Sequence, residues 1–224
     1  MIRTRIITGV IPAGELNTVG ELARELGVSA TPIREALMDL ANEGIVEVMR
    51  NRGFRVPVLS EHDLDELFEL RLLLEVPALS RLAGGLDDAA LERYRQVAER
   101  IAAHARAGDL ISFLDEDRDF HLRLIGELGN RRLVETVRRL REQTRMVGLP
   151  DLAEQRSLRS SADEHVEIVR ALAAGDGERA ATIMHRHLEH TRGIWAGHDE
   201  VEAQPDGDGE AHTGASRGGL ATEQ

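Results

Sequence analysis

The sequence predicts a mainly α-helical protein in two folded parts: a small N-terminal unit that ends in a β-hairpin, and a larger all-helical bundle. Two observations predict this division. Apolar residues recur at helical spacing through most of the chain, whereas short β-rich runs occur only between residues 45 and 58. At 224 residues the chain is long enough for each part to bury a core of its own.

The N-terminal unit is predicted to begin with the last part of a helix, over residues 1–9. A turn at Pro12-Ala13-Gly14 follows, and a short helix then covers residues 22–26. Gly27 ends this helix at a position where a left-handed backbone is favourable.

The next helix is predicted to start near Pro32, because proline suits a first helical turn and Ser29 or Thr31 can cap it. Its apolar residues repeat at helical period and form one buried stripe: Ile33, Ala36, Leu37 and Leu40. Arg34 and Asp39 fall on the opposite, polar face.

Two β-rich runs follow at residues 45–49 and 54–58, and Arg50-Asn51-Arg52-Gly53 separates them as a hairpin turn. Two helices joined by a tight turn and followed by a hairpin form a winged helix-turn-helix. The second helix of such a unit has the size and polarity to enter a DNA major groove. A winged helix used only for protein contacts is the alternative.

The formal net charge of −12 is unevenly distributed. Residues 1–57 carry seven arginines and seven acidic residues. Residues 58–198 carry 20 arginines and 26 acidic residues, and residues 199–224 carry one arginine and seven acidic residues. Three arginines cluster on the predicted wing: Arg50, Arg52 and Arg55. The acidity argues against a non-specific nucleic-acid coat, but it is compatible with a sequence-specific reader.

Beyond a linker near residues 57–60, the pattern is helical throughout. Ser60 and Asp63 form a capping box for a helix over residues 60–83. Further helices are predicted at 87–108, 109–128, 130–147, 157–174 and 176–197, which gives a bundle of about six. The predicted domains are therefore residues 1–58 and 60–198. The acidic residues 199–224, poor in large apolar side chains, are expected to form a disordered tail.

The chain contains no cysteine, which excludes disulfides and thiolate metal sites. The apolar run at the N-terminus is too short for a signal peptide, and no segment approaches the roughly 20 apolar residues of a membrane span. We therefore expect a cytoplasmic protein with no membrane partner.

A possible metal site lies in the helical part. Asp117 and His121 are four residues apart, so both project from one face of a helix. His165 and His187 lie on two later helices joined by a turn at Gly175, so antiparallel packing can place them at one depth. Three imidazoles and a carboxylate suit Zn²⁺, Ni²⁺, Mn²⁺ or Fe²⁺. Any one of these histidines alone is more often a surface or core residue.

Several segments together resemble the GntR family of bacterial transcription regulators. GVSATPIREAL, L-A-x-E-G-I-V and N-R-G-F-x-V are similar to the DNA-reading domain of that family. DRDFHLRLIGELGN, EHVEIVRALAAGD and AATIMHRHLEH are similar to the FCD effector domain of its FadR subfamily. The resemblance covers residues 3–197.

Metal-binding members of the subfamily share a D-x-x-x-H motif, a His within E-H and a His within M-x-x-H-L. The matching residues here are Asp117, His121, His165 and His187. The resemblance therefore implies a bound divalent metal, with Zn²⁺ favoured and Ni²⁺, Mn²⁺ or Fe²⁺ as alternatives.

The resemblance also implies three partners: a double-stranded DNA operator, a small organic acid effector and a second copy of the chain. ELRLLLE at 69–75 matches the entry motif of the effector domain, and Arg71 is the arginine expected to hold the carboxylate of the effector. An Arg71 on the helix surface, paired with Glu75 at i,i+4, is the alternative.

By the same resemblance, the residues expected to contact DNA are Thr31, Arg34, Arg52 and Gly53. The family often has arginine where this chain has Gly20 and Ala30. Losing a contact between arginine and guanine costs about 1–3 kcal/mol of discrimination, so we expect a different operator or weaker binding. Arg24 could compensate.

The predicted function is a sequence-specific transcription regulator, with repression favoured, whose operator affinity is controlled by a small carboxylate bound near a metal ion. A metal-dependent hydrolase or lyase with an appended winged helix is the alternative from another class. No separate nucleophile or general-base motif supports that alternative. In a third hypothesis the metal has a purely structural role.

Overall fold

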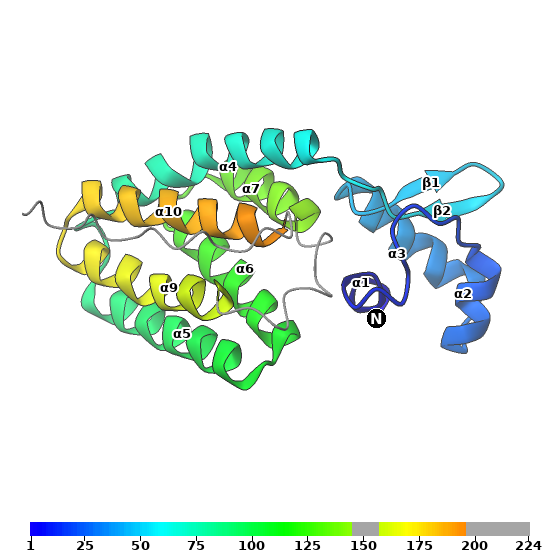
Figure 1. Ribbon diagram of the computed structural model, residues 1–224, viewed down its shortest axis with the longest axis horizontal. Coiled ribbons are helices and arrows are strands. Elements are labelled where there is room, and N and C mark those ends of the chain that lie inside the picture. Colours follow the sequence, from blue (N-terminus) through cyan, green and yellow to red (C-terminus); the bar gives the residue numbers. More distant parts are fainter. Residues whose placement is uncertain (145–156, 196–224) are drawn as a thin grey trace, which may run out of the picture.

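The computed structural model describes residues 1–144 and 157–195, and it contains both predicted parts (Figure 1). We call residues 1–56 the head. It contains α1 (Ile2–Ile7), α2 (Val19–Leu26), α3 (Ala30–Asn42), β1 (Glu47–Met49) and β2 (Gly53–Arg55). We call the helices after residue 60 the bundle: α4 (Glu61–Leu82), α5 (Asp88–Ala107), α6 (Leu110–Gly126), α7 (Arg131–Thr144), α9 (Ser157–Ala173) and α10 (Gly177–Trp195). The predicted fold class is confirmed.

The helix-turn-helix of the head is formed by α2 and α3. α2 begins three residues earlier than predicted, because the Thr18 side chain caps it by accepting a hydrogen bond from the backbone N–H of Glu21. Gly27 ends α2 in the left-handed conformation, at φ +66°, as predicted. Ser29 is the residue before α3, although its side chain makes no capping hydrogen bond, and Thr31 lies exposed in the first turn.

The wing is a shorter hairpin than predicted. β1 and β2 pair antiparallel through Glu47–Arg55, Val48–Phe54 and Met49–Gly53. After Arg55 the chain leaves the hairpin, since Val56 forms a bridge with Ala13 instead. Phe54 also exchanges backbone hydrogen bonds with Asn17, which holds the wing against the segment that precedes α2.

The bundle follows the predicted capping signals closely. Ser60 and Asp63 form the predicted capping box at the start of α4, and the Asp87 side chain caps α5. α10 packs against α4 and α9, while α5 packs against α9 and α6. The predicted end of the helix after residue 144 and the tail over residues 199–224 lie outside the described residues.

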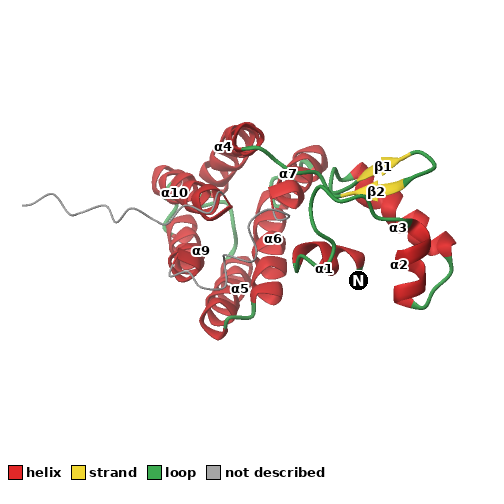
Figure 2. Cartoon of the chain, turned by 45° about the vertical axis from the view of Figure 1, so that its right-hand side comes forward, coloured by secondary structure: helices red, strands yellow, loops and turns green. Residues whose placement is uncertain are grey.

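The two parts have separate hydrophobic clusters, and α1 contributes to both. Ile2 and Ile6 belong to the cluster of the head, whereas Ile7 belongs to the cluster of the bundle. Accordingly, α1 lies on the side of the head that faces the bundle (Figure 2). Among the described helices, none is long and apolar enough to cross a membrane.

Candidate metal centre and DNA-reading surface

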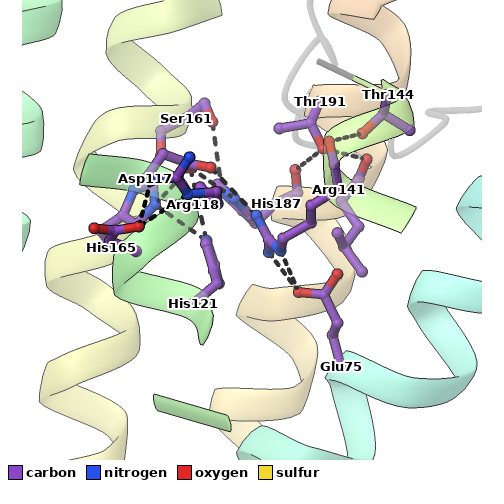
Figure 3. Close-up of polar contacts among 12 residues, drawn as sticks. Glu75, Asp117, Arg118, His121, Arg141, Thr144, Ser161, His165, His187 and Thr191 are labelled. Carbon is purple, nitrogen blue, oxygen red and sulfur yellow. Dashed lines mark hydrogen bonds and ion pairs between the residues drawn. The ribbon is translucent and has the colours of Figure 1, made fainter. Parts of the chain in front are cut away.

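The four predicted metal ligands meet inside the bundle. Asp117 and His121 project from α6, His165 projects from α9 and His187 from α10, and they point toward one another (Figure 3). One ligand atom from each lies within 4.8 Å of all the others. The three imidazoles are fully buried, and the Asp117 side chain is 15% exposed. This cluster could hold a metal ion.

The distances suit a single small cation. Two ligand atoms bound at about 2.1 Å to one tetrahedral ion are about 3.4 Å apart. Nε2 of His165 lies 3.0 Å from Oδ1 of Asp117 and 3.2 Å from Nε2 of His121. Nε2 of His121 and Nε2 of His187 lie 3.7 and 3.9 Å from the same Asp117 oxygen. These four separations lie on both sides of the ideal value, as expected for groups gathered around one ion.

Hydrogen bonds outside the cluster leave the inward-facing nitrogens of two histidines unprotonated. Nδ1 of His165 lies 3.1 Å from the backbone oxygen of Ser161, so it carries the proton and donates. Nδ1 of His187 donates to Oε2 of Glu164 at 3.1 Å. Nε2 of His187 is buried and has no hydrogen-bond partner among the described residues. A cation among these lone pairs and the Asp117 carboxylate would satisfy all of them, so the residues fit a metal.

The electrostatic surroundings keep Asp117, His121 and His187 in the forms that bind a metal. Burial would raise the pKa of Asp117, but the close contact with His165 and the neighbouring positive charge, including that of Arg141, hold that pKa well below its ordinary value. Burial, together with the nearby charge of Arg141, lowers the pKa of His121 well below its ordinary value. Burial also lowers the pKa of His187. Ionised carboxylate and neutral imidazole are the forms that bind metals.

A second group of charged residues adjoins the cluster, and sequence reasoning found only part of it. Arg141 of α7 donates from Nη1 to Oδ2 of Asp117 at 3.2 Å and from Nε to Oε2 of Glu75 at 2.9 Å. Arg71 donates to the other oxygen of Glu75, at 2.8 Å. Arg71, Glu75 and Arg141 are all buried. The predicted alternative, in which Arg71 pairs with Glu75, is therefore confirmed for the pairing. It is wrong for the location, because Arg71 is buried and not on the helix surface.

Sequence reasoning missed Arg141 and Glu164. Arg141 follows Val137 by four residues and therefore lies on the apolar stripe of α7, which is a signal that the sequence does contain. Glu164 is buried and accepts hydrogen bonds from His187 and from Arg186, which orients the His187 ring. Its position directly before His165 places it on a neighbouring face of α9, and nothing in the sequence indicates that it faces α10.

Three of the four predicted DNA contacts, Arg34, Arg52 and Gly53, line one hollow of the head. Thr31, Arg34 and Arg52 are exposed. A hollow of about 460 Å³ separates α3 from the wing, and its lining includes Arg34, Arg50, Arg52 and Gly53. The glycine at position 53 has a structural explanation, because a Cβ there would lie 2.0 Å from the backbone oxygen of Asn17, at φ +135°.

The wing arginines are not equivalent. Arg55 donates to Glu47 across the hairpin at 2.7 Å, so its charge is partly compensated within the wing. Arg50 and Arg52 are exposed, and both line the hollow that faces α3. Within the wing, the positive charge available to a nucleic acid therefore lies at the hairpin tip.

Comparisons with known proteins agree with this architecture. The head matches the model described as bacterial regulatory proteins, gntR family, over residues 1–56, and the bundle matches the FCD domain over residues 66–190. The chain is 32% identical over 180 residues to the Nta operon transcriptional regulator of Aminobacter aminovorans, covering 80% of this chain and 82% of that protein.

It is also 33% identical over 183 residues to the probable D-xylose utilization operon transcriptional repressor of Paenarthrobacter nicotinovorans, covering 82% and 80% of the two chains. Among solved structures, E. coli McbR/YncC has the same fold, with a TM-score of 0.75 at 24% identity over 87% of this chain and 93% of that one.

These findings define the class of protein as a DNA-binding transcription regulator, not an enzyme. The chain belongs to the GntR family of bacterial regulators and carries an FCD effector domain. The alternative of a hydrolase or lyase with an appended winged helix is therefore set aside.

Proposed function

We propose that this protein is a homodimeric repressor whose operator affinity is controlled by a small carboxylate effector, bound beside a divalent metal that Asp117, His121, His165 and His187 hold. The observation that carries the proposal is the convergence of these four ligands in a bundle attached to a DNA-reading head. Zn²⁺ is favoured, with Ni²⁺, Mn²⁺ or Fe²⁺ as alternatives. Residues 1–58 and 60–198 are the proposed domain limits.

The charge balance of the site supports an anionic effector. The carboxylates of Asp117 and Glu75 balance the guanidinium groups of Arg71 and Arg141. A divalent cation adds two positive charges to this buried region, and a negatively charged ligand would compensate them. Four protein ligands already complete a tetrahedron, so an effector that binds the metal directly requires five or six coordination.

Arg71 is the proposed contact for the effector carboxylate, and reaching it requires a rearrangement. The hollow beside Arg71 is about 10 Å³, which is room for about one water molecule and not for an organic acid. The Glu75 carboxylate also occupies the Nε donor of Arg71. An effector would therefore displace Glu75 or separate α4 from α10, and such a change in helix packing is what a sensor needs.

The proposed DNA contacts are Thr31, Arg34, Arg52 and Gly53, in a dimer that places two α3 helices in successive major grooves. A surface for the second copy is available on α4. Leu70 and Leu73 lie three residues apart on one face of α4 and are 46% and 64% exposed. Exposed apolar side chains next to each other favour burial against a partner.

The test uses the full chain and a DNA duplex that the wild-type protein selects from a random-sequence library. Binding is titrated with chelator alone, with Zn²⁺, and with Zn²⁺ plus each member of a panel of di- and tricarboxylates. We expect a sequence-preferring complex whose Kd changes about 5–150-fold with at least one acid. Failure to select any preferred duplex would contradict the proposal.

The same titration separates sensing from a purely structural metal. A structural ion would raise the stability of the bundle without changing the response to the acids. Thermal unfolding with and without chelator, measured beside the DNA titration, distinguishes the two roles.

A further inference from the structure

The last turn of α7 lies between the metal centre and the head. Three consecutive residues of this turn, Arg141-Glu142-Gln143, each contact a different part of the molecule, and we call them the α7 link. Arg141 contacts Asp117 of the candidate metal site, Glu142 contacts both α1 and α6, and Gln143 packs against the turn after α3.

The first residue of the α7 link shares a carboxylate with the proposed metal. Oδ2 of Asp117 accepts a hydrogen bond from Arg141 at 3.2 Å, while Oδ1 of Asp117 faces the three imidazoles. Arg141 is also held by Glu75. A cation bound at Oδ1 would withdraw negative charge from Asp117 and weaken its attraction for Arg141. Metal occupancy would therefore change how firmly α7 is held against α6.

The second residue joins the bundle to the head through a buried carboxylate. Glu142 accepts hydrogen bonds from Arg3 of α1 and from Arg118, the neighbour of Asp117 on α6. Arg3 also pairs with Glu43, the residue that ends α3. One arginine therefore connects the α7 link to the end of α3.

The third residue places its side-chain amide beside the backbone of the head. Gly44, at φ +78°, forms the turn directly after α3, and a Cβ on it would lie 2.2 Å from Nε2 of Gln143. The Gln143 amide therefore fills the space that a side chain at position 44 would occupy, and a shift of α7 changes this contact.

We propose that the α7 link transmits metal occupancy at Asp117 to the orientation of α3, the helix proposed to enter the DNA major groove, through Glu142 to Arg3 and from Arg3 to Glu43. This inference rests on the proposed function, because it needs a metal at the cluster. Since the three residues belong to one helical turn, a change at Arg141 moves the other two with it. The coupling is reciprocal, so DNA alters Zn²⁺ affinity by the same factor by which Zn²⁺ alters DNA affinity.

The experiment compares the full-length wild type with Glu142→Gln and Arg3→Gln, with Glu135→Gln as the matched control. Glu135 lies on α7 and pairs at the surface with Arg138 and Arg139, away from the residues of the link. Arg3→Gln is included because Glu142 is buried and its replacement could impair folding, whereas Arg3 is 27% exposed. No variant changes a proposed metal ligand or a proposed DNA contact.

Three quantities are measured for each protein: the Kd for Zn²⁺, the Kd for the duplex selected by the wild type with and without Zn²⁺, and amide hydrogen exchange in α1 with and without Zn²⁺. We expect Zn²⁺ to change the DNA affinity of the wild type and of Glu135→Gln about 5–150-fold and to change exchange in α1. In Glu142→Gln and Arg3→Gln, the Kd for DNA measured with Zn²⁺ should differ from the Kd measured without it by no more than about twofold, while Zn²⁺ still binds.

Each other outcome has a distinct meaning. If Zn²⁺ changes the DNA affinity of Glu142→Gln and Arg3→Gln as much as that of the wild type, the α7 link does not carry the coupling, and the inference is overturned. If the wild type binds Zn²⁺ and DNA with no coupling between them, the inference also fails, while the metal site and the DNA-reading function stand. If the wild type does not bind Zn²⁺ at all, it is the proposed metal site that fails.

Discussion

In the head, the arginines proposed to contact DNA are exposed. In the bundle, the arginines beside the candidate metal site are buried and form ion pairs with carboxylates. Arg34 and Arg52 are open to solvent on a hollow surface. Arg71 and Arg141 both bind the buried carboxylate of Glu75. An exposed charge acts on an external partner over a screening distance of about 8–10 Å. A buried pair instead fixes internal geometry and makes the packing sensitive to any added charge.

The comparison predicts that buried charge matters most for stability. Glu75→Leu leaves the buried guanidinium of Arg71 without its carboxylate and leaves Arg141 with Asp117 alone, and removing one partner of a buried pair costs about 3–5 kcal/mol. We expect this loss in the free energy of unfolding, measured by urea denaturation of the metal-free protein. Glu135→Leu, which breaks only exposed pairs on α7, should change it by less than about 0.5 kcal/mol. Equal effects of the two substitutions would remove the distinction between the regions.

A second prediction concerns the ligand set. His165→Ala removes the imidazole with the shortest contact to Asp117, 3.0 Å, and should lower Zn²⁺ affinity more than the 10–100-fold typical of an outer-shell change. Isothermal titration with Zn²⁺ measures this. His185→Ala is the control, because His185 is exposed on α10 and its nearest recorded partner is Glu189. An unchanged Kd for His165→Ala would remove this histidine from the metal site.

A third prediction concerns the orientation of a ligand ring. Glu164→Gln weakens the acceptor of the His187 Nδ1 proton and should lower Zn²⁺ affinity about 10–100-fold. Glu167→Gln, one turn along α9, affects only a surface pair with Arg186 and should leave the affinity within about twofold. If both variants bind Zn²⁺ like the wild type, Glu164 does not orient His187.

The last prediction concerns the exposed side of the comparison. Arg34→Ala should cost about 1–3 kcal/mol of discrimination between the selected duplex and a mismatched one. It should leave Zn²⁺ affinity unchanged, because Arg34 is in the head. Competition binding at fixed salt measures the discrimination, and an equal loss on both duplexes would identify Arg34 as a phosphate contact instead.

The sequence predicted the ends of helices and the candidate metal ligands better than it predicted which buried charged residues contact one another. The cap at Ser60 and the stop at Gly27 depend on residues a few positions apart, and both are confirmed. The four-residue spacing of Asp117 and His121 placed two ligands on one helix face. The family motifs, rather than spacing alone, indicated that the two histidines of α9 and α10 belong with them.

What the sequence could not supply is the pairing of charges across long separations. α7 contains several arginines. The spacing from Val137 places Arg141 on the buried stripe, but only the packing of α7 against α4 and α6 brings it to Glu75 and Asp117. The contact of Arg3 with Glu142 joins residues 139 positions apart. Neither partner has a distinctive sequence context, because an arginine on a polar helix face looks the same whether or not another element covers it.

The most direct test of the central claim is X-ray absorption at the Zn edge, recorded on the full-length protein after Zn²⁺ loading and dialysis. The account predicts stoichiometric metal with three imidazole nitrogens and at least one carboxylate oxygen at about 2.0–2.2 Å. Retained Zn²⁺ without imidazole in its first shell, or no retained metal, would contradict it.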